Sequence, residues 1–160
     1  MSETGKILVI DDDESIRRTV SLTLEHAGYS VDSAGNGEEA IEKVKVNFYN
    51  LALIDVRLPD MEGTELLTAL EDTTPRMVKI ILTGYPGLQN AVTAINKGVD
   101  GYLIKPVNPK ELVALINEHL LKQKRERVYG EERVAQFIET RFKQLETKKL
   151  ATTKLKTAGG

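Results

Sequence analysis

Acidic residues follow two short apolar runs in this sequence, at the points where β-strands are expected to end. Asp11 and Asp12 come directly after the run 7–10, and Asp55 comes directly after the run 51–54. In an open parallel α/β sheet, residues just past the carboxyl ends of the strands line a shared crevice. Three carboxylates gathered there repel one another, and a hard divalent cation or the uptake of protons relieves that repulsion.

Two later polar residues are expected at the same edge of the sheet. Thr83 ends the apolar run that begins at residue 78, and Lys105 follows the run 101–104. A hydroxyl and an ammonium group beside crowded carboxylates can bind the oxygens of a phosphoryl group. The set of side chains is therefore typical of a site that handles phosphoryl groups.

Strand-length apolar runs alternate with segments of helical periodicity, which favours a doubly wound α/β fold. Right-handed crossovers then predict a flavodoxin-like, five-stranded parallel sheet with strand order 2-1-3-4-5 and a ligand crevice between its first and third strands. The predicted strands are 6–10, 29–34, 51–54, 78–82 and 101–104, and the predicted helices begin after Asp13, at Gly37, at Gly63, near Leu88 and at Pro109.

The composition is that of an ordinary globular protein, with 41% hydrophobic and 29% charged residues. The absence of cysteine excludes disulfides, thiolate metal sites and cysteine nucleophiles. The first predicted strand leaves no room for a signal peptide, and no apolar run approaches the roughly 20 residues of a membrane span. A cytoplasmic protein is therefore expected.

Charge is distributed unevenly along the chain, although the net charge is only −2. Met1–Glu118 carries 11 basic and 19 acidic residues, a net charge of −8, whereas His119–Gly160 carries 11 basic and 5 acidic residues, a net charge of +6. This asymmetry suggests that the acidic part and the basic part of the chain have different functions. We expect a globular domain over residues 1–122 and a basic, amphipathic helical extension over residues 123–160.

Four motifs in order resemble the receiver domains of two-component response regulators, over about residues 6–121. They are ILVIDDDESIR (7–17), IDVRLPDMEG (54–63), ILTGY (81–85) and GYLIKP (101–106). Each motif is weak alone, but the ordered set is specific. The resemblance implies a phosphoprotein of a phosphorelay, a signalling domain that catalyses its own phosphoryl transfer and dephosphorylation rather than a conventional enzyme.

The resemblance also implies roles for the acidic residues. Asp55 corresponds to the phosphoacceptor, which takes a phosphoryl group from a sensor histidine kinase or a phosphotransfer protein. Asp12, Asp55 and the backbone carbonyl of Arg57 correspond to the ligands of Mg²⁺, and Asp11 supports them, often through water. Mg²⁺ prefers a few protein oxygens in an octahedron that water and phosphate complete.

The remaining roles implied by the resemblance concern binding and switching. Lys105 corresponds to the cation that pairs with the phosphoryl oxygens, and the family usually has a cis peptide bond between Lys105 and Pro106. Thr83 corresponds to the hydroxyl that bonds the phosphoryl group, and Tyr102 to the ring that moves inward when Thr83 shifts. The surface expected to respond comprises the helix 88–96, the strand 101–104 and the helix from Pro109, and its downstream protein target is unknown.

Other interpretations of these residues are disfavoured. Asp13, Glu14 and Ser15 are expected only to cap a helix and to compensate its dipole. A haloacid-dehalogenase-like phosphatase would use Asp11 as its nucleophile, but it needs a late acidic pair, and residues 105–108 read KPVN. A flavin-binding protein is disfavoured because an acidic first loop repels phosphate in the absence of a metal.

The extension contains an apolar stripe at helical spacing, formed by Val134, Phe137, Ile138, Phe142 and Leu145. We expect the segment 128–130 to end or break the preceding helix, and residues 150–160 to be disordered. One helix is too little for a helix-turn-helix or winged-helix output domain. The expected partner of the stripe is the globular domain itself, a second copy in a homodimer or a groove in another protein, and nucleic acid is disfavoured.

Overall fold

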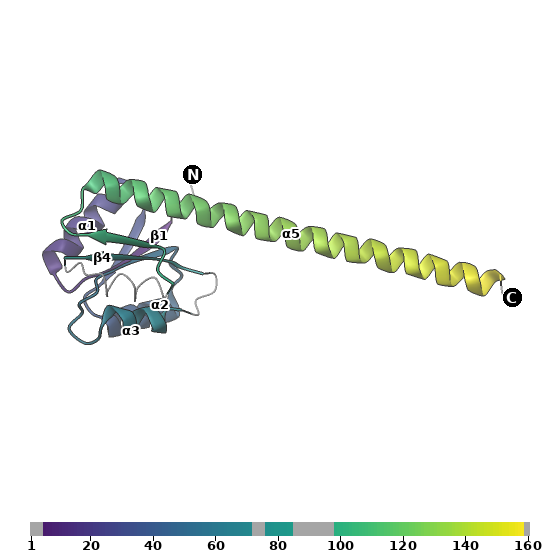
Figure 1. The fold of residues 1–160 in the computed structure, drawn as a ribbon, viewed down its shortest axis with the longest axis horizontal. Coiled ribbons are helices and arrows are strands. Elements are labelled where there is room, and N and C mark those ends of the chain that lie inside the picture. Colours follow the sequence, from purple (N-terminus) through teal and green to yellow (C-terminus); the bar gives the residue numbers. More distant parts are fainter. Residues whose placement is uncertain (1–4, 72–75, 85–97, 159–160) are drawn as a thin grey trace. The chain divides into compact units, whose positions relative to one another are not determined.

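The computed structural model describes residues 5–71, 76–84 and 98–158. The described residues form one parallel sheet with strand order β2-β1-β3-β4-β5, and helices alternate with its strands (Figure 1). The strands are β1 (Lys6–Ile10), β2 (Ser30–Ala34), β3 (Leu51–Ile54), β4 (Val78–Thr83) and β5 (Gly101–Ile104), and the helices are α1 (Glu14–His26), α2 (Gly37–Val46), α3 (Gly63–Ala69) and α5 (Pro109–Ala158). The predicted fold class and strand order are confirmed. The helix expected over residues 88–96 lies outside the described residues.

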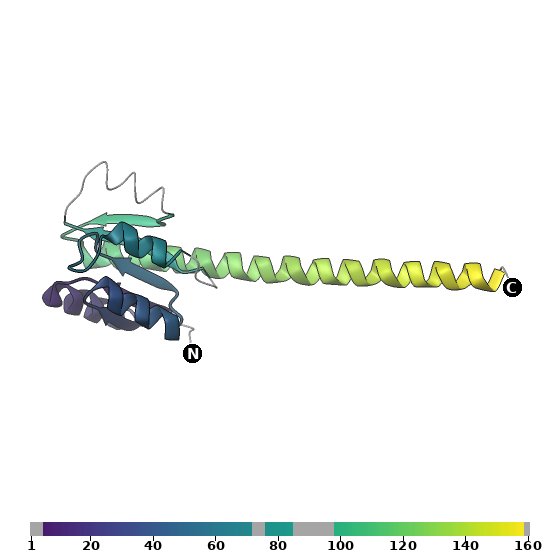
Figure 2. The same ribbon diagram turned by 90° about the horizontal axis from the view of Figure 1, so that it is seen from below.

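The sheet is covered on both faces, which explains why its strands are continuous apolar runs rather than alternating ones. Leu8 and Ile10 of β1 belong to the core on the side of α2 and α3, whereas Ile7 and Val9 belong to the core on the side of α1 and the first turns of α5. Figure 1 shows these two layers of helices on opposite sides of the sheet, and in Figure 2, seen from below, α2 and α3 lie in front of it. This packing fixes the register of the strands, and with it the position of every residue at their carboxyl ends.

The first helix begins and ends at residues suited to those positions. The side chain of Asp13 caps α1 by accepting a hydrogen bond from the backbone N–H of Ile16 at 3.1 Å, as the sequence predicted. Beyond the other end, Gly28 has a φ of 99°, a conformation that glycine adopts at little cost. The short connection to β2 can therefore turn sharply.

Two predictions about the C-terminal region were wrong. α5 continues without interruption through residues 128–130, and it remains helical from residue 150 to Ala158. Gly130 costs a helix only about 1 kcal/mol relative to alanine, and the nearby runs KQKRER (122–127) and EER (131–133) consist of good helix formers. No proline or glycine lies between Leu150 and Ala158, so nothing in that segment forces the helix to stop earlier.

The chain divides into two compact units, Met1–Leu121 and Lys122–Gly160. The first unit holds the sheet and both cores. In the second unit the stripe is exposed, as the helix presents Val134, Phe137, Ile138, Phe142 and Leu145 to solvent. Among the described residues, no helix has the length and apolar character required to cross a membrane.

Candidate functional site

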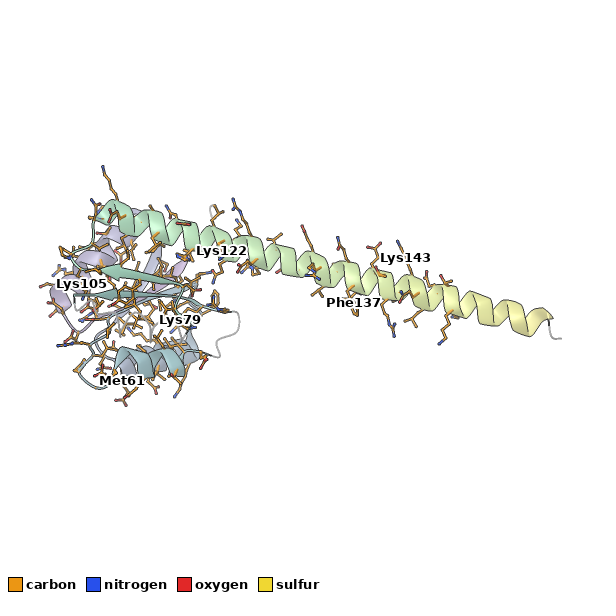
Figure 3. All side chains as sticks on the ribbon, in the orientation of Figure 1. Met61, Lys79, Lys105, Lys122, Phe137 and Lys143 are labelled. Atoms are coloured by element: carbon orange, nitrogen blue, oxygen red, sulfur yellow. The ribbon has the colours of Figure 1, made fainter. Side chains whose placement is uncertain are left out.

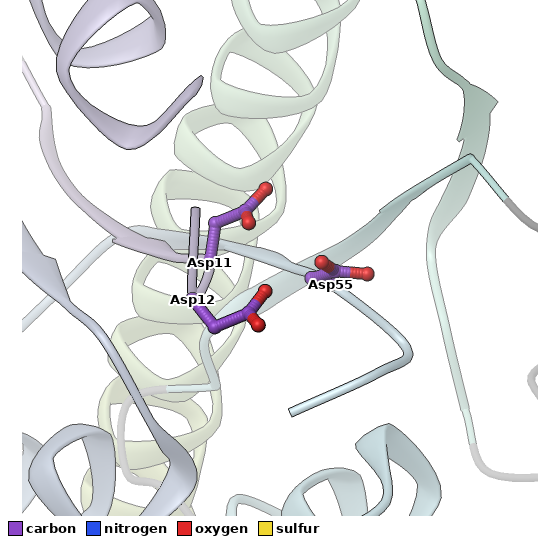
Figure 4. Close-up of side chains that lie close together, drawn as sticks. All are labelled: Asp11, Asp12 and Asp55. Carbon is purple, nitrogen blue, oxygen red and sulfur yellow. The ribbon is translucent and has the colours of Figure 1, made fainter. Parts of the chain in front are cut away.

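Three carboxylates meet at the carboxyl ends of β1 and β3. The strands are neighbours, with Ile10 opposite Ile54, so the residues that follow them emerge side by side. Carboxylate oxygens of Asp11, Asp12 and Asp55 lie within 4.8 Å of one another, and Figure 4 shows the three side chains close together. Asp11 and Asp55 are buried, whereas Asp12 is exposed. The cluster therefore has two carboxylates held in the protein and one open to solvent.

Lys105 contributes the positive charge of the site. It follows β5, and its Nζ lies 2.6 Å from Oδ2 of Asp11 and 3.3 Å from Oδ2 of Asp55. Sequence reasoning paired this lysine with a phosphoryl group, whereas the structure also gives it a partner within the protein, Asp11. The peptide bond between Lys105 and Pro106 is cis, as expected.

The surroundings change the pKa of both groups in the longer of these two ion pairs, Asp55 and Lys105. Burial is the largest influence on Asp55 and raises the pKa of its carboxyl; the charge of Asp11 adds to this rise, while the Arg57 N–H and the Lys105 ammonium oppose it. For Lys105, burial alone would lower the pKa of the ammonium group. Its hydrogen bond to Asp11 and the charges of Asp11 and Asp55 outweigh burial and raise that pKa. The lysine thus stays charged beside the two acids.

Two hydrogen bonds hold the loop that follows β3 and Asp55. The backbone N–H of Arg57 donates to Oδ1 of Asp55 at 3.2 Å, and the N–H of Gly63 donates to the carbonyl of Val56 at 2.7 Å. A Cβ on Gly63 would lie 2.8 Å from the Cα of Val56, so only glycine allows this close approach. Arg57 is placed two residues after Asp55, with an exposed side chain.

Thr83 and Tyr102 come from adjacent strands. Thr83 is fully buried at the end of β4, and its carbonyl accepts a hydrogen bond from the backbone N–H of Lys105 at 2.7 Å. Tyr102 lies opposite Ile81 and packs against the core, with its hydroxyl buried and without a hydrogen-bond partner among the described residues. Tyr85, which completes the third motif, lies outside the described residues.

Two supporting contacts of the site were missed by sequence reasoning. Nη1 of Arg17 donates to the backbone carbonyl of Asp11 at 2.7 Å, which ties α1 to the end of β1. Asp60 accepts hydrogen bonds from the backbone N–H groups of Gly37 and Glu38, both at 2.9 Å, and so ties the loop after β3 to α2. Arg17 and Asp60 stood within the motifs, but neither spacing nor charge indicated a backbone partner.

The donor set fits a hard divalent cation. The cluster offers only carboxylate oxygens, which Mg²⁺ and Ca²⁺ prefer, and its three acids outnumber the single ammonium of Lys105. The exposure of Asp12 leaves a side open to water and to phosphate oxygens, as a magnesium site requires. Neither histidine nor cysteine takes part in the cluster among the described residues, so a site of the zinc type does not fit.

Comparisons with known proteins agree with the geometry. Residues 7–117 match the family model of the response regulator receiver domain. The uncharacterized transcriptional regulatory protein YkoG of Bacillus subtilis (strain 168) is 37% identical over 118 residues, which make up 74% of this chain and 52% of that protein. Response regulator ArlR of Staphylococcus saprophyticus is 35% identical over 120 residues, 74% of this chain and 53% of that protein. The chain spans about half the length of these curated relatives.

A solved structure shows the same similarity to receiver domains over the length of a whole domain. A response regulator receiver domain protein (CheY-like) from Methanospirillum hungatei JF-1 superposes with a TM-score of 0.74 at 45% sequence identity. The match covers 78% of this chain and 99% of that protein. The part of this chain that the match leaves uncovered corresponds in length to the C-terminal unit.

Proposed function

Because this chain belongs to the family of response regulator receiver domains, we propose that it accepts a phosphoryl group on Asp55 from a sensor histidine kinase or a phosphotransfer protein. The observation that carries the proposal is the position of Asp55. Its carboxylate is buried at the end of β3 and held between the N–H of Arg57 and the ammonium of Lys105. Both neighbours favour the ionised form, which is the form that can act as a nucleophile.

The proposed reaction exchanges one bond to phosphorus for another. A carboxylate oxygen of Asp55 forms a bond to the phosphorus atom, the P–N bond of the donor phosphohistidine breaks, and its electron pair returns to the imidazole. Lys105 lies close enough to Asp55 to bind the phosphoryl oxygens as they arrive. Positioning and charge stabilisation account for most catalysis in such transfers.

The proposed cofactor is Mg²⁺. Asp12, Asp55 and the backbone carbonyl of Arg57 would hold the cation, and Asp11 would support it through water. When bound, the cation would neutralise charge on the transferring group. The negative charge of the cluster supports this assignment, because its three carboxylates carry more charge than the Lys105 ammonium that pairs with two of them.

The proposed output is a change in protein binding at the surface formed by β5, α5 and the helix expected over residues 88–96. A phosphoryl group on Asp55 would offer the Thr83 hydroxyl a new acceptor, and the Tyr102 ring would follow Thr83 inward. Such a switch requires an interaction that differs between two states, and this hydrogen bond is one. The downstream target would be a protein, and the place of action the cytoplasm.

Two alternatives are less well supported. A phosphatase with Asp11 as nucleophile would need a further pair of acids after the last strand to hold its metal, but residues 105–108, which follow β5, read KPVN. The second alternative is binding to nucleic acid. The name of YkoG describes that protein as a transcriptional regulator, and that protein is about twice as long as the matched region. Residues 1–118 carry a net charge of −8, which disfavours binding to nucleic acid.

The test is phosphorylation of the full chain by acetyl phosphate in the presence of Mg²⁺, read by intact mass and by mapping the modified residue. The wild type should gain one base-labile phosphoryl group, and Asp55→Asn should gain none, because an amide is a poor nucleophile. Asp13→Asn is the matched control, since asparagine caps a helix as well as aspartate and the fold is kept. Labelling of Asp11 in the wild type would refute the proposal and support the phosphatase.

A further inference from the structure

Apolar side chains in the C-terminal unit recur at intervals that alternate between three and four residues. Ala135, Ile138, Phe142 and Leu145 follow this spacing, and Val128 stands seven residues before Ala135. An average period of 3.5 residues is typical of the a and d positions of a coiled coil. In this heptad register Val128, Ala135 and Phe142 occupy a, and Ile138 and Leu145 occupy d. We call Ala135, Ile138, Phe142 and Leu145 the seam.

The seam is an unpartnered apolar face in the described structure. Ile138 is 57% exposed, Phe142 65% and Leu145 54%. These fractions are large for side chains of this kind, which are among the residues most often buried. A lone helix with this much exposed apolar surface gains stability when a partner covers it.

The charges beside the seam select the partner and its direction. In a parallel pair of helices, each g residue lies next to the e residue of the following heptad on the other helix. This places Arg127 next to Glu132 of a second copy, and Arg141 next to Glu146 of that copy. Both contacts join opposite charges, and the twofold symmetry of the pair makes each contact twice.

The antiparallel arrangement would bring like charges together. There g residues face g residues and e residues face e residues. The g positions hold Arg127, Val134, Arg141 and Lys148, and the e positions hold Arg125, Glu132, Glu139 and Glu146. Arginine would mostly meet arginine or lysine, and glutamate would mostly meet glutamate. The acidic e residues also border the seam, which disfavours an anionic membrane or nucleic acid as its occupant.

We propose that a second copy of this chain occupies the seam, with the two C-terminal helices paired in parallel and in register. This interaction is independent of phosphorylation at Asp55 and goes beyond the function proposed above. Glu131 occupies d before the seam, and Lys149 occupies a after it. These polar residues restrict the apolar contact to about one and a half heptads, so the pairing is weak and depends on concentration.

The first test measures self-association of the full chain by sedimentation velocity over a wide range of protein concentration. The wild type should pass from monomer to dimer, and Ile138→Asp should weaken the association by on the order of tenfold or more, because a charge at d is buried in the pair. Phe137→Asp is the matched control. Phe137 is 70% exposed but occupies c, off the seam, and its side chain projects from the helix in Figure 3. Circular dichroism of both variants checks that the helix remains.

The second test addresses direction. Arg141→Glu and Glu146→Arg should each weaken the dimer by roughly tenfold, and the double exchange should restore it, because a parallel pair regains both opposite-charge contacts. The chain has no cysteine, so Lys149→Cys introduces a single thiol at an a position. In a parallel pair, this thiol should form a disulfide with the equivalent thiol of the second copy. The thiol introduced by Thr147→Cys, at an f position, should not form one.

Some outcomes would overturn the proposal. A monomer at every concentration would exclude the second copy as the occupant. Equal effects of Phe137→Asp and Ile138→Asp would show nonspecific association rather than a seam. Failure of the double exchange to restore the dimer would exclude the parallel register.

Discussion

Lys105 and Asp11 form the shortest ion pair of the described site, with 2.6 Å between Nζ and Oδ2, although 94 residues separate them in the chain. Both side chains are largely buried, with exposed fractions of 17% and 4%. A buried carboxylate that has lost water needs such a partner. Lys105 thus stabilises the metal-free site, in addition to its proposed role in binding the phosphoryl oxygens.

The first prediction follows from this pair. Lys105→Ala should lower the free energy of unfolding by about 3 kcal/mol without metal, because it leaves Asp11 buried and uncompensated beside two more acids. Mg²⁺ should stabilise the variant more than it stabilises the wild type, because the competing ammonium is gone. Chemical denaturation with EDTA and with Mg²⁺ measures both effects. Lys110→Ala, at an exposed position, is the control and should change neither quantity.

The second prediction separates the metal ligand from the ion pair. Asp12→Asn should weaken Mg²⁺ binding by on the order of tenfold or more, because it removes one charge within a few ångströms of the cation. It should change the free energy of unfolding by less than about 0.5 kcal/mol, since Asp12 is exposed. Isothermal titration calorimetry measures the affinity. If Lys105→Ala lost Mg²⁺ affinity as severely as Asp12→Asn, the proposed division of roles would be wrong.

Much of the site was predictable because it depends on strand order. Once the runs ending at Ile10 and Ile54 were identified as neighbouring strands, Asp11 and Asp55 had to emerge side by side. The partner of Lys105 was not predictable in the same way. Asp11 and Asp55 are both within reach of its flexible side chain, and only the packing around the site decides which contact is shorter.

The C-terminal helix was harder to predict, because weak local preferences decide its ends. The glycine at 130 suggested a break, but its cost of about 1 kcal/mol is small, and good helix formers dominate the nearby runs 122–127 and 131–133. The starts of the other helices were clearer. Asp13 caps α1 and Pro109 begins α5, and both residue types have strong positional preferences there.

The third prediction concerns the proposed switch. Addition of beryllofluoride and Mg²⁺ should shift backbone amide resonances at Thr83, at Tyr102 and in α5 up to Leu121, in addition to those at the site. The Tyr102 hydroxyl has no partner to give up among the described residues, so movement of the ring breaks no hydrogen bond there. Heteronuclear NMR of the full chain measures the shifts, and Asp55→Asn is the control that should show none. Shifts confined to the loops after β1 and β3 would exclude the switch.

The fourth prediction compares two glycines. Gly63→Ala should destabilise the protein by about 1–3 kcal/mol, because its Cβ would lie 2.8 Å from the Cα of Val56, a backbone atom that moves only with the Asp55 loop. Phosphorylation at Asp55 should slow as well. Gly130→Ala should instead favour the helix by up to about 1 kcal/mol, since nothing lies within 4 Å of the added atom. Thermal unfolding and the rate of labelling by acetyl phosphate distinguish the two variants, and equal stability of both would contradict the close approach at Gly63.

The fifth prediction is a pH-dependent stability effect at a cluster away from the site. The Tyr49 hydroxyl donates to Oδ2 of Asp32 at 2.6 Å, and Nζ of Lys6 lies 3.4 Å from the same oxygen. The hydrogen bond from Tyr49 is the largest cause that lowers the pKa of Asp32, followed among the lowering influences by Lys6. Because the folded protein holds this pKa below its unfolded value, the ionised carboxylate stabilises the fold above the unfolded pKa, and that contribution disappears as pH falls through the folded pKa.

Tyr49→Phe should therefore lower the free energy of unfolding by about 1 kcal/mol at neutral pH, a modest value because Asp32 is partly exposed. The difference from the wild type should shrink as the pH falls below the ordinary pKa of an aspartate and Asp32 becomes protonated in the folded protein. Urea unfolding of both proteins across this range measures the difference. Tyr29→Phe is the matched control, because the Tyr29 hydroxyl bonds to the side-chain amide of Asn117, which does not titrate. A loss in Tyr49→Phe that stayed constant with pH would mean that the hydroxyl stabilises the fold in a way other than through its bond to the Asp32 carboxylate.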